Sequence, residues 1–316
     1  MSQVDDLQAV AQDIRAAAHT VIEGKPEAIE LALIALFSSG HLLIEDVPGV
    51  GKTMLAKTLA RAIDGTAQRI QFTPDLLPSD ITGVSIFNAE RRDFEFKPGG
   101  VFATIVIGDE INRASPKTQS ALLEAMEERQ VTVDGVTHPL PDPFMVIATQ
   151  NPIEMEGTYP LPEAQRDRFM LRISMGYPAR AAEVAMLDHH GGGDPLADLR
   201  PVTDAARVSE LAAGVRGIFV HAAIKDYLVA VLDATRHNPD VRLGGSPRAG
   251  LQLLRACKTR AALHGRHYVI PDDVQALAAP ALAHRILLSP TAQLAQRSVE
   301  DIVRAAVDSV GVPDRD

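Results

Sequence analysis

The stretch HLLIEDVPGVGKT at residues 41–53 constrains the fold more than any other part of the chain. It begins as an apolar run of the kind that forms a buried strand, and it ends as a loop with two glycines. Apolar side chains then recur at helical spacing at Leu55, Leu59, Ala60 and Ile63. The pattern predicts a strand, a loop and a helix in direct succession, in which open backbone N–H groups and the helix N-terminus face one anion site.

Residues 46–53 match the phosphate-loop template GxxxxGK[ST] at every fixed position except the first. In this template small residues leave the backbone open to phosphate, the lysine reaches the β- and γ-phosphates, and the threonine hydroxyl ligates Mg²⁺. The stretch therefore predicts a site for ATP and Mg²⁺. The residues assigned to the site are Gly49, Val50, Gly51, Lys52 and Thr53.

Asp46 stands where the template has its first glycine. An aspartate can occupy the tight turn out of a strand, but its charge would be unfavourable if it faced a triphosphate. We therefore expect the Asp46 side chain to point away from the phosphates, toward solvent or a neighbouring backbone.

A second acidic strand end, in TIVIGDE at residues 104–110, supplies what a hydrolytic nucleotide site needs. Asp109 would hold Mg²⁺ through water, and Glu110 would orient and polarise the attacking water. Folds that only bind nucleotides need the aspartate but not the second acid. The pair therefore favours hydrolysis, with Glu110 catalytic, over a scaffold that binds ATP and barely hydrolyses it.

The rest of the pattern predicts an α/β domain followed by a helical one. Apolar runs at 102–107 and 144–148 suit parallel strands buried on both faces, and Asp134-Gly135 is a strong two-residue hairpin signal. Three glycines and a proline then interrupt the helical pattern, and the adjacent His189 and His190 there suit a linker better than a metal site. The predicted units are a nucleotide-binding domain at 1–186, a linker at 187–200 and a helical domain at 201–316.

Composition argues against several classes of function. Lysine and arginine total 31 against 41 acidic residues, a net charge of −10, which disfavours a nucleic-acid partner. The basic run at 255–267 is more typical of a solvated helix face. Apolar runs are too short for a membrane span, and Cys257 is the only cysteine, so an intrachain disulfide is excluded and a cytoplasmic location is expected.

The phosphate loop, GDEINRA, FMVIATQNP and GGSPRA occur in this order, and with them the chain resembles the MoxR family of AAA+ ATPases over nearly its whole length. The resemblance implies that Asn151 is sensor 1, which helps place the attacking water. Arg168 matches the arginine finger that reaches a neighbouring subunit's nucleotide, with Arg166 as the alternative. Arg248 matches sensor 2 on the lid, which reads the γ-phosphate of its own or the neighbouring subunit.

The resemblance also implies an AAA+ P-loop domain with a parallel sheet, two insertions and an all-α lid. The insertions are the helix-2 insertion at 83–100 and the hairpin before sensor 1 at 131–138, both placed to grip a substrate protein. Ile22 and Gly24 lie where such ATPases hold the base. Besides Asp46, the chain departs from the family pattern at Gly108, where a small side chain is frequent.

The expected function is that of a ring-forming, hexameric Mg-ATP motor with chaperone-like work on a protein complex or metalloenzyme. The resemblance implies a homo-oligomer, a protein client and a partner with a von Willebrand factor A domain. A magnesium-chelatase-like motor subunit is the first alternative, and a nucleic-acid translocase is a weaker one. The client and the site on which sensor 2 acts stay open.

Overall fold

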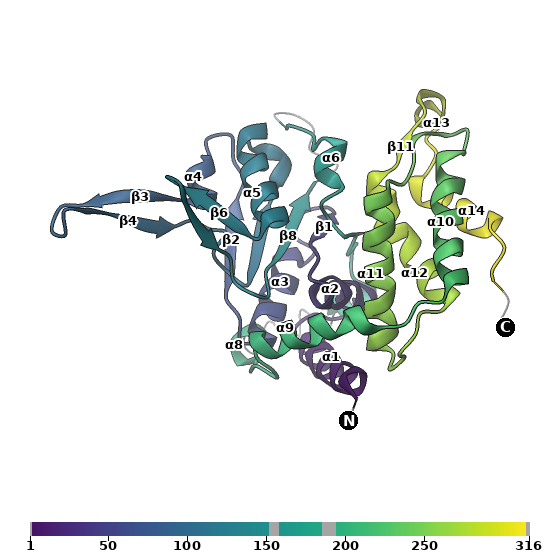
Figure 1. Cartoon of the computed structure of the whole chain (residues 1–316), viewed down its shortest axis with the longest axis horizontal. Coiled ribbons are helices and arrows are strands. Elements are labelled where there is room, and N and C mark those ends of the chain that lie inside the picture. The colour runs from purple at the N-terminus through teal and green to yellow at the C-terminus, as the bar shows by residue number, and fades with distance from the viewer. Residues whose placement is uncertain (1, 152–157, 185–193, 314–316) are drawn as a thin grey trace.

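The computed structural model describes residues 2–151, 158–184 and 194–313. Its centre is a parallel sheet in the order β2-β5-β8-β1-β9, flanked by helices and continued by a helical lid (Figure 1). The strands of the sheet are β1 (Leu42–Glu45), β2 (Ala67–Gln71), β5 (Ile105–Asp109), β8 (Met145–Gln150) and β9 (Leu171–Ile173). Because all five strands run the same way, their carboxyl ends meet at one edge.

The sheet separates two hydrophobic cores, since successive side chains of a strand point to opposite faces. On β5, for example, Ile105 and Ile107 belong to one core and Val106 to the other. One face is covered by α1 (Gln3–His19), α2 (Pro26–Phe37) and α3 (Lys52–Ala62), and the other by α4 (Pro78–Thr82) and α5 (Pro116–Glu128). Burial on both faces explains why the strands read as continuous apolar runs.

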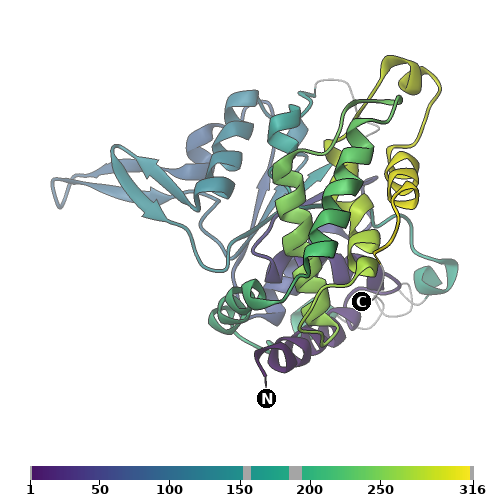
Figure 2. The same cartoon turned by 45° about the vertical axis from the view of Figure 1, so that its right-hand side comes forward.

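The lid is joined to the first of these cores without a break. Buried residues of the lid, such as Val231, Leu253 and Leu277, share one cluster with those of α1 to α3, and α11 packs against both α1 and α2. The main lid helices are α10 (Ala222–Arg236), α11 (Pro247–Leu263), α12 (Pro271–Leu282) and α14 (Val299–Ser309). Figure 1 shows them grouped beside the sheet domain, and in Figure 2 they lie in front of it. The lid and the helices on this face of the sheet therefore share one core.

Shorter elements complete the chain. They are α6 (Glu163–Arg166), α8 (Pro195–Asp198), α9 (Ala205–Gly214), α13 (Pro290–Leu294), β10 (Val241–Leu243), β11 (Leu287–Leu288) and the 3₁₀ turns η1 (Ile111–Arg113), η2 (Val215–Gly217) and η3 (Ala283–Arg285).

Two hairpins extend from the domain on the side away from the lid. The hairpin β3 (Gly83–Asn88) and β4 (Asp93–Pro98) projects furthest, and β6 (Gln130–Val133) and β7 (Val136–Pro139) lie beside it in Figures 1 and 2. Phe96 of the first stacks on His138 of the second with ring centroids 3.7 Å apart. The predicted insertions are therefore both hairpins, and they contact each other.

Most elements lie where the sequence places them, with shifts at their ends. The apolar run predicted as a strand at 102–107 becomes β5 only from Ile105 and continues to Asp109. The lid is helical as predicted, apart from the antiparallel pair β10 and β11. Much of the predicted linker, including His189 and His190, lies outside the described residues. In the described part of the chain, no helix is long and apolar enough to cross a membrane.

Candidate functional site

The phosphate loop lies between β1 and α3, as its sequence predicts. Gly49 and Gly51 have φ of 83° and 91°, values that a residue without a side chain adopts at little cost. Gly51 is the N-cap of α3, and Lys52 is the first helical residue. The Lys52 Nζ donates to the carbonyl oxygen of Asp46 at 2.8 Å, and burial lowers its pKa against the opposing pull of nearby acids. The Lys52 ammonium group is thus folded back onto the backbone of its own loop.

The Asp46 carboxylate is bound to the segment after β9, although its charge still acts on Lys52. Its carboxylate accepts hydrogen bonds from the backbone N–H of Val47 at 2.9 Å, from that of Gly176 at 2.6 Å and from the Ser174 hydroxyl at 3.1 Å. Burial raises the pKa of Asp46, but these donors outweigh it and leave the pKa below its usual value. The side chain therefore points to a neighbouring backbone, as expected, and it ties the start of the loop to the segment after β9.

Asp109 ends β5 at the carboxyl edge of the sheet. Its Oδ1 accepts from the Thr149 hydroxyl at 2.5 Å, and its Oδ2 accepts from Nη2 of Arg69 at the same distance. Half of the Arg69 side chain is exposed, so this ion pair opens at little cost. Thr149 fixes Oδ1 of Asp109. Arg69 is the group that a cation binding at Asp109 would displace.

Glu110 follows in a left-handed conformation with φ of 56°, which turns the chain sharply after β5. Its Oε2 accepts from Gln71 Nε2 at 2.9 Å and from Arg113 Nη1 at 3.1 Å. Gln71 ends the neighbouring strand β2, and sequence reasoning passed over both it and Arg69. Because Ile70 is the only buried residue of β2, the sequence AQRIQ has no apolar run that would predict a strand.

An apolar pocket adjoins the phosphate loop. It is formed by the turn after α1, the loop glycines, Met54 and the segment after β9, including Tyr177. Lys25 closes one side, because its Nζ donates to the carbonyl oxygens of Gly176 at 3.0 Å and Tyr177 at 2.8 Å. Ile22 lines this pocket, where the sequence resemblance places the nucleotide base.

Asn151 directly follows β8, between the strands that carry the loop and the acid pair, and it is buried. The structure therefore brings the loop, Asp109, Glu110 and Asn151 to the same edge of the sheet.

The two predicted arginines lie at the other edge. Arg168 precedes β9, and the neighbouring Met170 N–H donates to His41, the residue before β1. The Arg168 Nη2 lies 3.0 Å from one carboxylate oxygen of Glu127 at the end of α5. Arg248, from the lid helix α11, lies 2.5 Å from the other oxygen of the same carboxylate.

The length of β1 therefore separates these arginines from their own phosphate loop. The five residue steps from 41 to 46 span about 16 Å of extended backbone. Arg166, the alternative finger, is half-buried, and its charge is close enough to lower the pKa of His284 in the lid.

Comparisons with known proteins agree with this architecture. The profile of the ATPase family associated with various cellular activities matches residues 41–171, and an AAA lid domain matches 233–306. Chaperone MoxR1 of Mycobacterium tuberculosis is 44% identical over 93% of this chain and 80% of its own. The protein YeaC of Bacillus subtilis is 51% identical over 93% and 92%, and Protein MoxR of Paracoccus denitrificans is 33% identical over 99% of each. The crystal structure of a candidate ATPase from Cytophaga hutchinsonii superposes with a TM-score of 0.92, at 35% identity and over 99% and 97% of the two chains.

The fold and the loop at the edge of its sheet define a AAA+ ATPase, a nucleotide-binding enzyme. The chain belongs to the MoxR family of AAA+ ATPases, as its long matches to proteins of that name require. The resemblance in sequence and the fold predicted from it are both confirmed.

Proposed function

We propose that this chain is a chaperone-type motor that assembles into a ring of six copies and hydrolyses Mg-ATP at the boundaries between subunits. One observation carries the proposal: the loop and the acid pair lie at one edge of the sheet, while Arg168 and Arg248 lie at the other, beyond a strand segment about 16 Å long. A single subunit thus carries the loop and acid pair of one ATP site and the arginines of another. Two copies joined head to tail would bring both parts together in one complete site.

Each half has a distinct task. Val50 and the loop glycines present backbone N–H groups to the phosphates, and Lys52 adds a point charge. Glu110 takes a proton from the attacking water at Oε2 once Gln71 and Arg113 release that atom. The neighbour's Arg168 neutralises charge on the γ-phosphate, an effect worth about 10³ to 10⁵ in rate in other nucleotide hydrolases. We place Arg248 on the same neighbouring nucleotide, because it shares Glu127 with Arg168.

The residues at the loop fit a magnesium ion. Thr53 would offer its hydroxyl and Asp109 its carboxylate, and oxygen ligands of this kind suit Mg²⁺. Asp109 and Glu110 both act electrostatically on Lys52, so the acid pair lies within reach of the loop. When bound, the ion would neutralise charge on the phosphates. Asn151 would complete the arrangement by orienting water from the end of β8.

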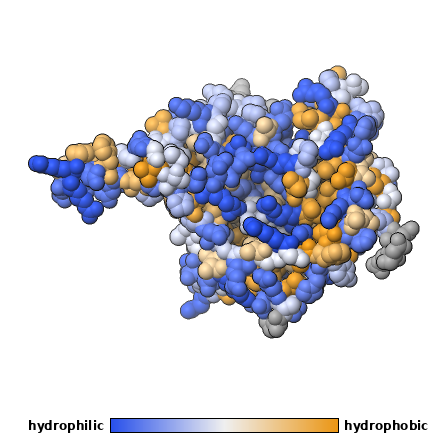
Figure 3. Space-filling view, viewed as in Figure 1, coloured by the Kyte–Doolittle hydropathy of each residue, from blue (hydrophilic) through white to orange (hydrophobic). Residues whose placement is uncertain are grey.

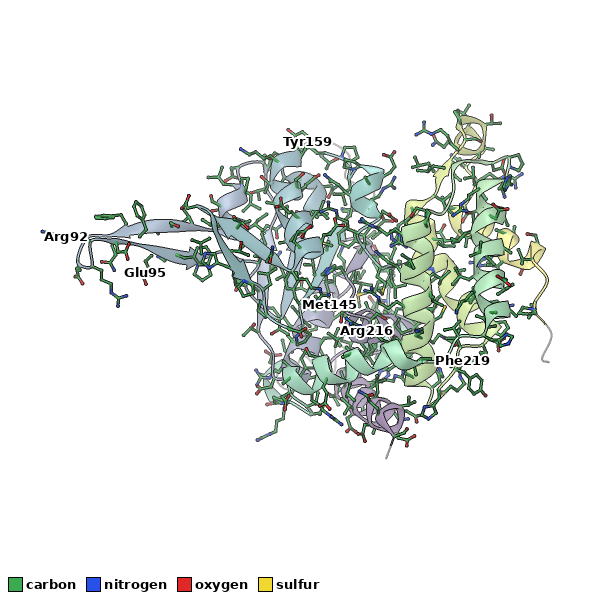
Figure 4. All side chains as sticks on the ribbon, viewed as in Figure 1. Arg92, Glu95, Met145, Tyr159, Arg216 and Phe219 are labelled. Atoms are coloured by element: carbon green, nitrogen blue, oxygen red, sulfur yellow. The ribbon has the colours of Figure 1, made fainter. Side chains whose placement is uncertain are left out.

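The client is gripped, in this proposal, by the hairpin β3–β4. Phe87 and Phe94 form an edge-to-face pair with centroids 5.5 Å apart, yet they are 54% and 68% exposed. Figure 4 shows Arg92 at the far end of this hairpin, well clear of the body, and Figure 3 shows apolar residues behind its hydrophilic tip. Exposed aromatic pairs on a projecting arm suit an apolar segment of a partly unfolded protein.

Three further parts of the proposal rest on the family. The working units are the nucleotide-binding domain at 1–186, the linker at 187–200 and the lid at 201–316. A protein with a von Willebrand factor A domain would be the partner, and the work would be maturation of a protein complex or metalloenzyme. A cytoplasmic location fits a chain with a single cysteine.

ATP turnover per subunit, measured with Mg²⁺ over a wide range of protein concentration, tests the proposal. A steep rise with concentration is expected, because each site needs an arginine from a second copy. Constant turnover down to protein shown by sedimentation to be monomeric would refute both the shared site and the ring.

A further inference from the structure

The lid holds the segment that carries the finger. Asp167, directly before Arg168, accepts from the Ser246 hydroxyl at 3.3 Å through both carboxylate oxygens, and its Oδ1 lies 3.1 Å from Arg285 Nε. Gln252 donates to the Asp167 carbonyl oxygen at 3.2 Å. All three partners belong to the lid, so the lid fixes both the backbone and the side chain of Asp167, a residue of the nucleotide-binding domain.

The contact extends to the residue after the finger. The carbonyl oxygen of Phe169 accepts from Arg285 Nη2 and lies 3.0 Å from His284 Nε2. Arg168 is thus flanked on both sides by residues that the lid binds. Its own side chain reaches Glu127, which also binds Arg248 of the lid.

Arg285 is the centre of this contact, and its burial is unusual for an arginine. Its side chain is 2% exposed, whereas that of Asp167 is 19% exposed. Burial lowers the pKa of Arg285 to about 10, and the Asp167 carboxylate opposes that effect. A buried guanidinium is stable only while its partners stay in place, so the contact either holds together or breaks as a unit.

We propose that Arg285 is a positioning residue for the finger, and that the Arg285–Asp167 contact carries movement of a subunit's lid to the site of its neighbour. A rotation of the lid must carry Asp167 with it or break the buried pair. The adjoining Arg168 then shifts relative to the neighbour's phosphates, and a displacement of about 1 Å at a reacting centre changes rate by about 10²-fold. This inference rests on the proposed function, because it requires a finger that acts on a second subunit.

Mixed rings isolate the effect. A donor subunit with Glu110→Gln keeps its finger but lacks the water-activating acid, and an acceptor with Arg168→Ala has the reverse defect. Each alone is expected to be nearly inactive, and an equimolar mixture should regain turnover at acceptor sites that face a donor. A mixture that regains nothing would refute the proposed function, and the coupling with it.

The decisive donors carry Glu110→Gln together with Arg285→Lys or with Asp167→Asn. Turnover in the mixture should fall about tenfold relative to the parent donor, while assembly by sedimentation and ATP affinity stay the same. Both substitutions disturb a buried ion pair and should lower the melting temperature, so turnover is measured well below it. The matched control donor carries Arg266→Lys, which disturbs another arginine–aspartate pair that lies wholly within the lid, at Asp273. The control donor should leave turnover in the mixture unchanged.

Two results would overturn the inference while the proposed function stands. The first is regained turnover that is equal with the Arg285→Lys, Asp167→Asn and control donors. The second is a loss of turnover that only follows a loss of assembly, since the contact would then serve folding alone.

Discussion

Replacing Asp46 by glycine would restore the phosphate-loop template, yet we expect it to weaken the protein without improving the site. The variant loses three hydrogen bonds to a carboxylate, from Val47, Ser174 and Gly176. Bonds to charged groups contribute about 1.5 to 3 kcal/mol each, but water can replace part of them at the edge of the loop. With about 1 kcal/mol for each bond, the free energy of unfolding should fall by about 3 kcal/mol.

Affinity for ATP is the second measurement on the same variant. Because the Asp46 carboxylate is turned to the segment after β9, its removal should not relieve repulsion of a triphosphate. Urea unfolding and titration with a fluorescent ATP analogue would measure the two effects. Binding more than about tenfold tighter, or about 1.4 kcal/mol, would show that the charge does face the phosphates. Unchanged stability would show that the three hydrogen bonds contribute nothing.

The pH dependence of stability follows from the same residue. The pKa of Asp46 is lowered in the folded protein from its ordinary value of 3.8. Its contribution is therefore fully present above that value and is lost as the pH falls through the folded pKa. The difference in stability between the parent protein and Asp46→Asn should accordingly be constant near neutral pH and shrink below about pH 4. A difference that grows on acidification would contradict the assignment.

Three further substitutions test separate parts of the molecule. Gln71→Ala frees Glu110 from one hydrogen bond and should raise basal ATP turnover about three- to tenfold, as a steady-state assay would show; a fall would mean that Gln71 orients the acid instead. Glu127→Gln removes the charge that holds Arg168 within its own subunit, so it should lower the protein concentration that gives half-maximal turnover about two- to fivefold. Glu128→Gln is the control. If both variants give the same dependence of turnover on concentration, Glu127 does not compete for Arg168. Phe94→Ala should leave unfolding and basal turnover unchanged but abolish stimulation by an unfolded model protein, and persistent stimulation would exclude the hairpin as the grip.

The parts of the site that lie close together in sequence could be predicted, because local patterns specify them. A strand, two glycines and a helix define the loop, and one apolar run ending in two acids defines the second strand end. The carboxyl end of β5 lies two residues beyond the predicted one because Gly108 and Asp109 have low strand propensity, although pairing with β2 continues through both.

Contacts between distant parts of the chain could not be predicted in the same way. Gln71 and Glu110 are 39 residues apart, and Asp46 and Gly176 are 130 apart. Neither partner has a local pattern that indicates the other. The sequence could predict that Asp46 avoids the phosphates, from charge alone, but only the order of strands in the sheet identifies what it binds.

The position of β9 explains why an aspartate at residue 46 matters, because β9 runs between the two edges of the sheet. Arg168 precedes the strand, and Ser174 and Gly176, which bind Asp46, follow it. Within the strand, Arg172 binds Glu45, the residue before Asp46, at 2.9 Å, and it also binds Glu300 of the lid. A glycine at the first template position would leave the loop free to change shape without disturbing β9. The aspartate instead joins the start of the loop to the segment after β9, so we expect a change in the shape of the loop to be passed along β9 toward Arg168.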